Sequence, residues 1–279
     1  MEVDINSIKI FIDSIKENSN YDFSNYSEKS LSRRIDKILF DNRMSIEELA
    51  VKISKDKEFI EKIIIEVTVN TTEIFRDAKT WQLLKYKYID ELKEKEKISI
   101  WDIGCSTGQE VYSMLILLNE KNLLPKAEIL ATDLNSEVLK IAEKGVYKFR
   151  EIDEFIDNYE LVMCSNPYDD KNHIDIPHKK YFEISRRKNL IKIKPNLLNK
   201  IAFLKHDIIQ EKNIFDKKFD IIFCRNVLIY FKHDLQNKLF DFFYQNLNDD
   251  GLLIIGRHEG MLGPISNKFK KEESIYKKL

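Results

Sequence analysis

The sequence predicts an α/β fold with a mostly parallel sheet, preceded by a small helical domain and interrupted by an inserted antiparallel subdomain. Apolar residues recur at helical spacing through the first eighty positions, and residues 1–103 contain neither glycine nor proline. From residue 98, short β-branched runs alternate with helical segments, which is typical of a parallel sheet covered on both faces. The interval 146–200 breaks this alternation and holds three of the five prolines.

Four helices are predicted before residue 70. Apolar residues from Ile5 to Ile15 share one helix face, and those from Leu31 to Leu39 repeat the pattern. Ser45 and Glu48 form a capping-box signal for a third helix, and residues 59–64 supply the apolar face of a fourth. We therefore expect a helical domain over residues 1–68, followed by a linker over residues 69–80.

The stretch WDIGCSTGQE at residues 101–110 joins a predicted strand to a predicted helix. Residues 98–103 are apolar and β-branched, and residues 111–118 have the character of a helix. Gly104 and Gly108 allow a tight turn between them, which can present backbone N–H groups and a helix N-terminus to a ligand. The alternative is an ordinary strand-to-helix turn in which the glycines serve steric needs only.

Further strands are predicted at residues 128–133, 201–204, 219–224 and 252–255, with helices from residue 135 or 136 to 144 and at 235–247. Gly145 is expected to end the first of these helices. The stretches KKYFEISRR and LIKIKP predict short antiparallel strands. We assign residues 81–279 to the sheet domain and about 148–196 to the inserted subdomain.

Polar residues follow three of the predicted strands, where ligands bind in open α/β sheets. The three places selected in this way are the Gly104–Gly108 turn after the first strand, Asp133 after the second, and the pair Arg225–Asn226 after the strand at 219–224. Asp133 lies about 25 residues beyond the turn, roughly the interval at which an acid reaches a ribose diol. This order predicts an adenosine-containing cofactor. The turn lacks the G-x-G-x-x-G phosphate fingerprint, so S-adenosylmethionine, which has no phosphate, fits it better.

The net charge and the distribution of apolar residues indicate which kinds of partner the chain can have. The chain has 46 basic and 47 acidic residues, a formal net charge of −1, which argues against nucleic acid as the main partner. The N-terminus has no signal-peptide core, and no apolar run reaches membrane-spanning length. We expect a cytoplasmic protein that does not insert into membranes.

No metal is expected. The three cysteines lie too far apart to form a metal-ligand pair or a disulfide framework: Cys105, Cys164 and Cys224. His173, Asp175 and His178 could be considered as metal ligands, but neither a cysteine nor a third histidine supports such a site.

Several stretches resemble the chemotaxis receptor methyltransferases of the CheR type, in that family's order and spacing. They are NTTEIFRD (70–77), IWDIGCSTGQEVYS (100–113), ATDLN (131–135), FDIIFCRNVLIYF (219–231) and GLLIIG (251–256). SLSRRIDK (30–37) is similar to the family's basic N-terminal helix, and IKIKPNLLNKIAFLKHDI (191–208) is similar to its inserted region. The resemblance covers nearly the whole chain, and NTTEIFR with FCRNVLIYF is its most specific part.

The resemblance implies a Rossmann-like class I S-adenosylmethionine methyltransferase sheet and a protein-glutamate O-methyltransferase activity. Such an enzyme transfers a methyl group to glutamate carboxylates of chemoreceptors in chemotaxis adaptation, giving methyl esters and S-adenosylhomocysteine. The implied partner is the cytoplasmic helical domain of the receptors, and we expect a monomer.

The resemblance also implies site residues. The positions that match the family's cofactor-binding residues are Asn70, Thr72, Arg76, Gly104, Glu110, Asp133, Asp207, Ile208, Arg225 and Asn226. Tyr230 matches a tyrosine near the transferred methyl. We assign catalytic roles to two of them: Arg76 is expected to hold a carboxylate of the substrate or the cofactor, and Tyr230 to shape the methyl channel.

A basic helix face is the predicted receptor contact. Lys29, Arg33 and Lys37 lie at successive i+4 steps and share one face, with Arg34 beside it. Guanidinium groups at this spacing can fork onto carboxylates of an acidic helical partner. The alternative is a solvated helix face that Asp36 partly neutralises.

Two other functions remain open. One is a methyltransferase that acts on nucleic acid or a small molecule; Ser165–Tyr168 is similar to an N-P-P-Y loop but lacks its second proline and lies in the insert, so an Asn-Pro turn is preferred. The other is a non-catalytic receptor-docking homologue. The chain also departs from the family, which often has G-H-S-E where this sequence has Gly256, Arg257, His258 and Glu259.

Overall fold

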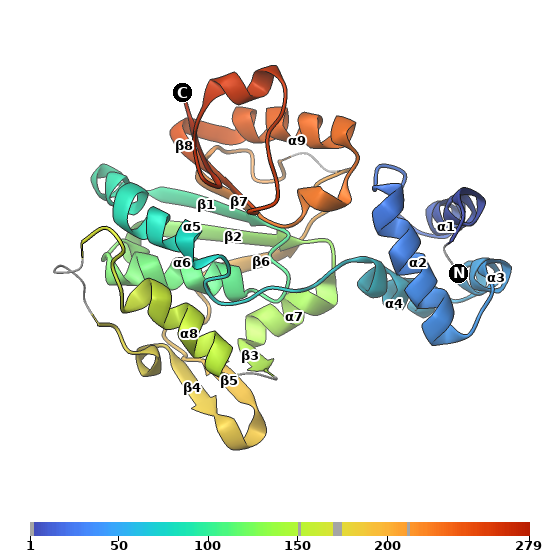
Figure 1. Ribbon diagram of the computed structural model, residues 1–279, viewed down its shortest axis with the longest axis horizontal. Helices are drawn as coiled ribbons and strands as arrows, with labels where there is room; N and C mark the ends of the chain where they lie inside the picture. Colours follow the sequence, from blue (N-terminus) through green and yellow to red (C-terminus); the bar gives the residue numbers. More distant parts are fainter. Residues whose placement is uncertain (1–2, 150–151, 170–174, 211–212) are drawn as a thin grey trace. The chain divides into compact units, whose positions relative to one another are not determined.

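The computed structural model describes residues 3–149, 152–169, 175–210 and 213–279 (Figure 1). Its contacts divide the chain into two compact units. A helical unit contains Met1–Asn70 and Val227–Leu239, and an α/β unit contains Thr71–Asn226 and Phe240–Leu279.

The helical unit contains the four helices predicted before residue 70, which are confirmed. They are α1 (Ile5–Asn18), α2 (Glu28–Asn42), α3 (Ile46–Lys55) and α4 (Lys57–Val67). A side-chain oxygen caps the start of each helix, and Ser45 with Glu48 forms the complete capping box at α3. The apolar faces meet in a small core of residues such as Phe11, Ile35 and Leu49.

The segment that follows strand β7 (Phe219–Cys224) also belongs to the helical unit. Within Val227–Leu239, the carbonyl of Tyr230 accepts a hydrogen bond from Ser27 N at 2.8 Å, and Lys232 N donates to Asn25 O at 2.9 Å. These bonds attach the segment to the loop between α1 and α2. The sequence assigned residues 227–239 to the domain over 81–279, whereas the contacts group them with the helices.

A seven-stranded sheet forms the centre of the α/β unit, and the predicted strands are confirmed. Its strand order is β6 (Ile201–Lys205), β2 (Ala127–Asp133), β1 (Ile98–Ile103), β7 (Phe219–Cys224), β8 (Leu247–Ile255), β10 (Ile275–Lys278) and β9 (Phe269–Glu272). The first five strands are parallel, and β10 is antiparallel to both of its neighbours. The parallel strands therefore place their carboxyl ends at one edge of the sheet.

Helices cover both faces of this sheet. Asp102 in β1 and Phe223 in β7 are paired in register, so their side chains point to the same face of the sheet. On this face the ring of Trp81 stacks on that of Phe223, with 5.6 Å between the ring centroids. The neighbouring residue of β1, Trp101, points to the opposite face, where its ring centroid lies 6.0 Å from that of Phe242. The helices involved, α5 (Ala78–Leu83) and α9 (His233–Asn246), thus pack on opposite sides. The two helices that follow β1 and β2 are α6 (Gln109–Glu120) and α7 (Ser136–Lys144).

Short helical turns complete the α/β unit. A π-helical turn (Leu84–Tyr88) and a 3₁₀ turn (Ile89–Glu94) follow α5, and further 3₁₀ turns span Leu124–Lys126, His178–Lys180, Arg186–Lys188 and Pro264–Lys268. In the helical unit, one such turn spans Leu228–Tyr230.

A separate three-stranded sheet occupies the predicted insert. Its order is β3 (Val146–Lys148), β5 (Leu190–Ile193) and β4 (Phe182–Ser185), all antiparallel. The expected antiparallel strands are therefore confirmed. Helix α8 (Ile152–Met163), which the sequence did not predict, packs on this sheet through Phe155, whose ring lies 4.9 Å from that of Phe182.

Candidate active site

The glycine turn between β1 and α6 has a backbone that side chains would disrupt. Gly104 and Gly108 have φ angles of 74° and 87°. A Cβ atom on Gly108 would lie only 2.8 Å from Cβ of Ala142 in α7. Glycine at 108 thus permits both the turn and the close approach of α6 to α7.

The backbone N–H groups of this turn bond to the end of β2. Gly104 N and Cys105 N donate to the carbonyl of Thr132 at 2.7 and 3.0 Å, and Ser106 N donates to Asp133 Oδ2 at 2.8 Å. A phosphate-binding turn would aim such groups at its ligand. Their engagement within the protein fits the interpretation that this turn does not hold a pyrophosphate.

Asp133 forms the centre of a buried polar group at the end of β2. The residue is 8% exposed, and its second oxygen accepts a hydrogen bond from Asn135 N at 2.9 Å. Burial raises the pKa of Asp133, while the bonds from the Asn135 and Ser106 amides oppose the increase. Ser106 Oγ and Asn135 Nδ2 are buried without a hydrogen-bond partner among the described residues.

Asp207 follows β6 at the same edge of the sheet. His206 N donates to the carbonyl of Asp133 at 3.0 Å, which brings the chain after β6 beside the end of β2. Asp207 Oδ1 accepts a hydrogen bond from Ile209 N at 2.9 Å, and Asp207 and Ile208 are both half-buried. The structure thus places the predicted pair next to Asp133.

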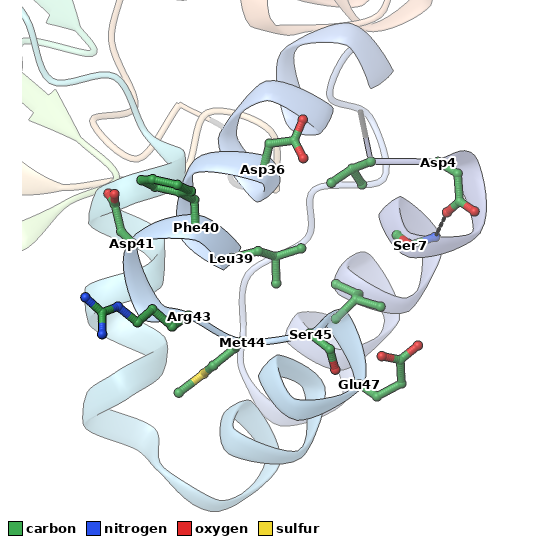
Figure 2. Close-up of a pocket in the computed structure, with 12 residues that line it drawn as sticks. Asp4, Ser7, Asp36, Leu39, Phe40, Asp41, Arg43, Met44, Ser45 and Glu47 are labelled. Atoms are coloured by element: carbon green, nitrogen blue, oxygen red, sulfur yellow. Dashed lines mark hydrogen bonds between the residues drawn. The ribbon is translucent and has the colours of Figure 1, made fainter. Parts of the chain in front are cut away.

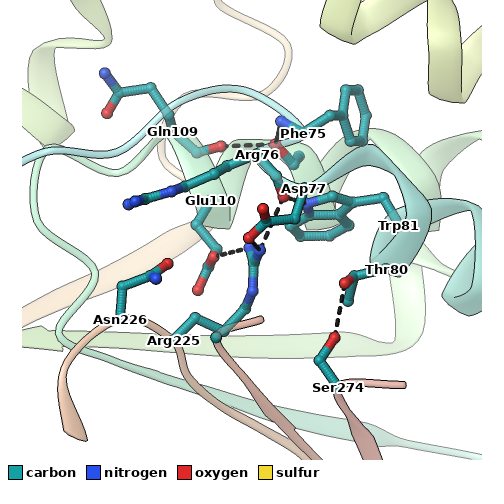
Figure 3. A network of polar contacts seen from close by, with 12 residues as sticks. Phe75, Arg76, Asp77, Thr80, Trp81, Gln109, Glu110, Arg225, Asn226 and Ser274 are labelled. Carbon is teal, nitrogen blue, oxygen red and sulfur yellow. Dashed lines mark hydrogen bonds and ion pairs between the residues drawn. The ribbon is translucent and has the colours of Figure 1, made fainter. Parts of the chain in front are cut away.

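Arg225, which directly follows β7, contacts several acidic and backbone groups and lies at the centre of a polar network (Figure 3). Its side chain is 1% exposed and forms ion pairs with Glu110 in α6 and with Asp77, the latter at 2.8 Å. Its guanidinium also donates to the carbonyl of Arg76 at 2.8 Å, and it lies 5.7 Å from the ring of Trp81. One buried cation therefore holds the segment before α5, the start of α6 and the end of β7 together.

The carboxyls around Arg225 outnumber the cations. Asp102, in β1, is almost fully buried, and its Oδ1 has no hydrogen-bond partner among the described residues. Burial, and secondarily the nearby Glu110, raise the pKa of Asp102 well above its ordinary value. Burial also raises the pKa of Glu110, although Arg225 opposes this change. The network thus has an excess of desolvated acids, an environment suited to a cationic ligand.

The backbone around this network adopts uncommon conformations. Phe75, Asp77 and Asn226 have φ angles of 53°, 59° and 60°, in the left-handed region that non-glycine residues rarely occupy. Phe75 N donates to Oγ of Ser113 in α6 at 2.9 Å, so this helix holds the backbone at Phe75 in place. Strain of this kind persists where surrounding contacts over-determine it, and it clusters at functional sites.

Arg76 has a fixed backbone and a freer side chain. Its carbonyl accepts bonds from Arg225 and from Trp81 Nε1, the latter at 3.0 Å. Its half-buried guanidinium donates to the carbonyl of Thr71 at 3.1 Å and points away from Arg225 (Figure 3). Thr72 is half-buried in the same segment.

Asn70 and Tyr230 belong to the helical unit, and their predicted roles at the cofactor stay predictions. The Asn70 amide donates to Thr68 O at 3.1 Å, near the end of α4. Tyr230 is half-buried in the segment that pairs with the α1–α2 loop.

The predicted receptor-contact residues lie along α2. Lys29, Arg33 and Lys37 are exposed and Arg34 is half-buried, and Lys37 forms an ion pair with Asp41. Within the described part of the chain, no ion pair engages the other three. Their charges are therefore available, and receptor binding remains a prediction.

A cavity of about 910 Å³ lies elsewhere in the helical unit (Figure 2). Apolar residues such as Leu39 and Met44 line it, together with acids that include Asp4, Asp36 and Glu47. None of the predicted site residues contributes to its lining. Its lining contains four acids and the cation Arg43, which is unsuited to an acidic partner, so this cavity does not extend the predicted receptor surface.

Three residues of the network were not predicted from the sequence. Asp77 pairs with Arg225, Asp102 is the buried acid of β1, and Glu259 Oε2 accepts bonds from Asn226 N at 2.9 Å and Gly256 N at 2.5 Å. Asp77 and Asp102 lie inside the quoted family stretches, and Glu259 lies three residues beyond the end of the stretch 251–256. The place of Asp77 in the stretch 70–77 and of Glu259 shortly after the stretch 251–256 was a sequence signal for these two acids, whereas Asp102 had no comparable signal.

The structure offers no support for a metal site, an N-P-P-Y-type loop or a membrane-spanning helix among the described residues. Among the described residues, no cluster of His, Cys, Asp and Glu could hold a metal, while His173 lies outside the described residues. Asn166 Oδ1 accepts a hydrogen bond from Tyr168 N at 3.0 Å, so Ser165–Tyr168 contains the expected Asn-Pro turn. No helix in the described part of the chain is long and apolar enough to cross a membrane.

Residues 70–277 match the family model described as the CheR methyltransferase SAM-binding domain. A Pseudomonas putida protein named Cher3 is 30% identical over 277 residues, covering 97% of this chain and 96% of its own. The chemotaxis protein methyltransferase of Listeria monocytogenes is 27% identical, covering 90% and 88%, and that of Borreliella burgdorferi is 32% identical, covering 72% and 68%. The matched range contains the glycine turn, Asp133 and the Arg225 network. The chain therefore belongs to the CheR methyltransferase family, whose S-adenosylmethionine-binding domain forms its α/β unit.

Proposed function

We propose that this protein transfers a methyl group from S-adenosylmethionine to glutamate side chains in the cytoplasmic helices of chemoreceptors. The products are glutamate methyl esters and S-adenosylhomocysteine, and the reaction serves chemotaxis adaptation. The observation that carries the proposal is the buried, acid-rich network around Arg225 in a chain of the CheR family.

The residues of the α/β unit fit S-adenosylmethionine. Its sulfonium and ammonium groups are positive, and Asp77, Asp102 and Glu110 outnumber the buried cation Arg225. Its ribose hydroxyls need polar partners. Ser106 and Asn135 bond to the Asp133 carboxylate through their backbone N–H groups, and their buried Oγ and Nδ2 atoms have no hydrogen-bond partner among the described residues. Buried polar groups without partners are costly, so ligand contacts there are favourable.

The proposed holding roles follow the carboxyl edge of the sheet. Asp133 takes the ribose hydroxyls, and Asp207 with Ile208 lies beside the adenine. Glu110 and the residues near Arg225 face the methionine end. Thr72, Asn70 and Asn226 complete the cofactor contacts implied by the family, and Gly104 allows the turn after β1.

The acceptor needs little proton transfer. Bound S-adenosylmethionine supplies an electrophilic methyl group on a positively charged sulfur. A glutamate side chain has a pKa of about 4.3 and is already ionised at neutral pH, so no general base is required. The main tasks of the protein are then to align the carboxylate and to exclude water. Arg76 is proposed to hold a carboxylate and Tyr230 to shape the methyl channel.

The proposed partner is acidic and helical. The exposed charges of α2 at Lys29, Arg33 and Lys37, with Arg34 beside them, can pair with receptor carboxylates. The near-balanced charge of the whole chain favours a protein over nucleic acid. A cytoplasmic monomer that needs no metal is part of the same proposal.

Radiolabelled S-adenosylmethionine tests the reaction. The protein is incubated separately with receptor cytoplasmic domains and with nucleic acid, and label is counted before and after mild alkali. Alkali-labile label on the receptor domain supports the proposal. Alkali-stable label on nucleic acid or on a small molecule contradicts it in favour of another methyltransferase, and cofactor binding without any transfer indicates a non-catalytic homologue.

Charge-removal variants test the partner surface in the same assay. The Lys29→Gln/Arg33→Gln variant is expected to raise KM for the receptor domain while leaving the affinity for S-adenosylmethionine unchanged. The matched control removes two exposed charges from α4, as Lys57→Gln/Lys62→Gln. Equal effects of the two variants would show that overall charge, and not the α2 face, guides the receptor.

A further inference from the structure

The cavity of about 910 Å³ in the helical unit lies where three helix ends meet (Figure 2). Its lining comes from the start of α1, the second half of α2 with the following turn, and the start of α3. The ring of Phe40 is 82% exposed, and Leu39 and Met44 are half-buried. A partner that covered these side chains would remove apolar surface from water, which favours binding.

Acidic side chains surround this apolar surface. They are Asp4, Asp36, Asp41 and Glu47, whereas Arg43 is the one cation among the described residues that line the cavity. Lys37 pairs with Asp41, and no ion pair engages the other three acids within the described ranges. In Figure 2 the side chain of Leu39 lies between Asp4 and Glu47 on one side and Phe40 and Asp41 on the other. The cavity is therefore apolar at its centre and negatively charged around it.

Helix capping accounts for only part of this acidity. Asp4 caps α1 by accepting a hydrogen bond from Ser7 N at 2.8 Å, and Glu47 lies in the first turn of α3. A cap needs a hydrogen-bond acceptor and not a charge, since asparagine caps helices as well as aspartate does. Asp36 lies inside α2 and caps no helix. The negative charge thus exceeds what the helix ends require.

We propose that this cavity binds a basic amphipathic helix of a partner protein other than the receptor. Aliphatic side chains of that helix pack on Leu39, Phe40 and Met44, in the manner of a helix bound in an apolar groove. Lysine or arginine residues beside the aliphatic ones pair with Asp4 and Asp36. A helix suits this lining because residues three and four positions apart form adjoining apolar and charged strips on its surface.

Charge separates this partner from the receptor. The proposed receptor surface of α2 is basic and accepts an acidic helix, whereas the cavity repels acids and accepts a basic one. The ion pair between Lys37 and Asp41 joins one residue of each surface. Juxtaposed like charges exclude a wrong partner, so one helical unit can select two partners of opposite charge. The inference thus goes beyond the proposed methylation and does not depend on it.

The experiment uses the full chain and two fluorescent synthetic peptides. One is an amphipathic helix of about 18 residues made of leucine and lysine, and the other has glutamate in place of each lysine. Binding is measured by fluorescence anisotropy at about 0.15 M salt, where long-range attraction is screened. We expect the lysine peptide to bind saturably at one site and the glutamate peptide to bind at least about tenfold more weakly.

Two variants test the lining. Asp4→Asn/Asp36→Asn removes two charges and keeps the cap of α1, and it should weaken binding of the lysine peptide about fivefold. Phe40→Ser removes an exposed apolar contact and should also weaken it about fivefold. The matched control Asp13→Asn/Glu58→Gln removes two exposed charges of the helical unit outside the lining and should stay within about twofold of the wild type.

An equal loss in the control would show that overall charge attracts the peptide, and it would overturn the inference. Equal binding of the two peptides, or no binding of the lysine peptide, would overturn it as well. The cavity variants should keep the wild-type kcat/KM for receptor methylation. A decrease like that of Lys29→Gln/Arg33→Gln would assign the cavity to the receptor surface and contradict the inference. If the wild type methylates no receptor domain, the proposed function fails, while the peptide measurements still decide the inference.

Discussion

Replacement of Arg225 by methionine removes the one buried cation to which the network is attached. The substitution keeps much of the side-chain volume and deletes the guanidinium. Glu110 and Asp77 then lose their ion-pair partner in a site where the Arg225 side chain is 1% exposed. The carbonyl of Arg76 keeps one donor, Trp81 Nε1 at 3.0 Å, so the cost arises mainly from the two carboxylates.

Breaking a buried ion pair by removing one partner typically costs about 3–5 kcal/mol. The upper part of this range is not expected, because Asp77 retains a quarter of its side-chain exposure and can be partly solvated. We therefore expect Arg225→Met to lower the free energy of unfolding of the α/β unit by about 3 kcal/mol at pH 7. The loss should shrink at lower pH, since Glu110 can then become protonated; each pKa unit is worth about 1.4 kcal/mol.

Urea denaturation followed by tryptophan fluorescence measures this change selectively, because both tryptophans, Trp81 and Trp101, lie in the α/β unit. The double variant Arg225→Met/Glu110→Gln should regain more than half of the lost stability. The control Arg186→Met breaks an exposed ion pair with Asp153 and should leave the midpoint unchanged. A loss below about 1 kcal/mol in Arg225→Met, or a double variant no more stable than the single one, would refute the central role of this cation.

Three further predictions concern the turn, the buried acids and Arg76. Gly108→Ala should lower the free energy of unfolding by about 1–3 kcal/mol, because φ is positive and a Cβ would clash with α7, whereas Gly260→Ala, in open space, should be neutral in the same denaturation assay. The affinity for S-adenosylmethionine, measured by calorimetry, should weaken as the pH falls from about 7.5 toward 5. Burial raises the pKa values of Asp102, Glu110 and Asp133 in the free protein, and a bound cationic ligand lowers them again. The complex therefore holds fewer protons than the free protein, and acid favours the free protein. An affinity independent of pH, or one that rises in acid, would contradict this linkage. Arg76→Ala should weaken cofactor binding or methyl transfer at least about tenfold, and near-wild-type values for both would exclude its role as a carboxylate-holding residue.

Local patterns predicted most of the elements that form the site. The β1 strand, the glycine turn and α6 follow from apolar spacing and two glycines, and Asp133 follows from its place at a strand end. Helix α7 ends at Gly145, as expected, because the left-handed conformation there suits glycine. Each of these features depends on a few consecutive residues, which is why sequence alone could reveal it.

Features that depend on distant partners were missed. Nothing local distinguishes Asp102 as a buried acid, since its environment comes from Glu110, Arg225 and Asp133 in other elements. Helix α8 was missed because its apolar residues are separated by acids in an interval that otherwise has a loop composition. The β9–β10 hairpin is rich in charge, and its strands are specified by pairing and not by their own pattern: β10 pairs with β8, and β9 pairs with β10.

The same limit applies to a cavity of about 540 Å³ between the start of α5, the loop after β8 and the β9–β10 hairpin. Arg257 was noticeable in the sequence as a departure from the family, but its neighbours Lys79 and Lys271 come from distant segments. Only the fold brings the three cations to one cavity, together with the acids Asp77, Glu259 and Glu273. The lining of such a cavity is visible only in the tertiary structure.

Mapping of the methylated side chain tests the central claim most directly. A receptor cytoplasmic domain is incubated with the protein and with S-adenosylmethionine that carries a deuterated methyl group, and its peptides are sequenced by tandem mass spectrometry. We predict that the deuterated methyl group is found on glutamate side chains as an ester and is lost after mild alkali. Label on any other side chain, label that resists alkali, or an unlabelled receptor domain would contradict the proposed activity.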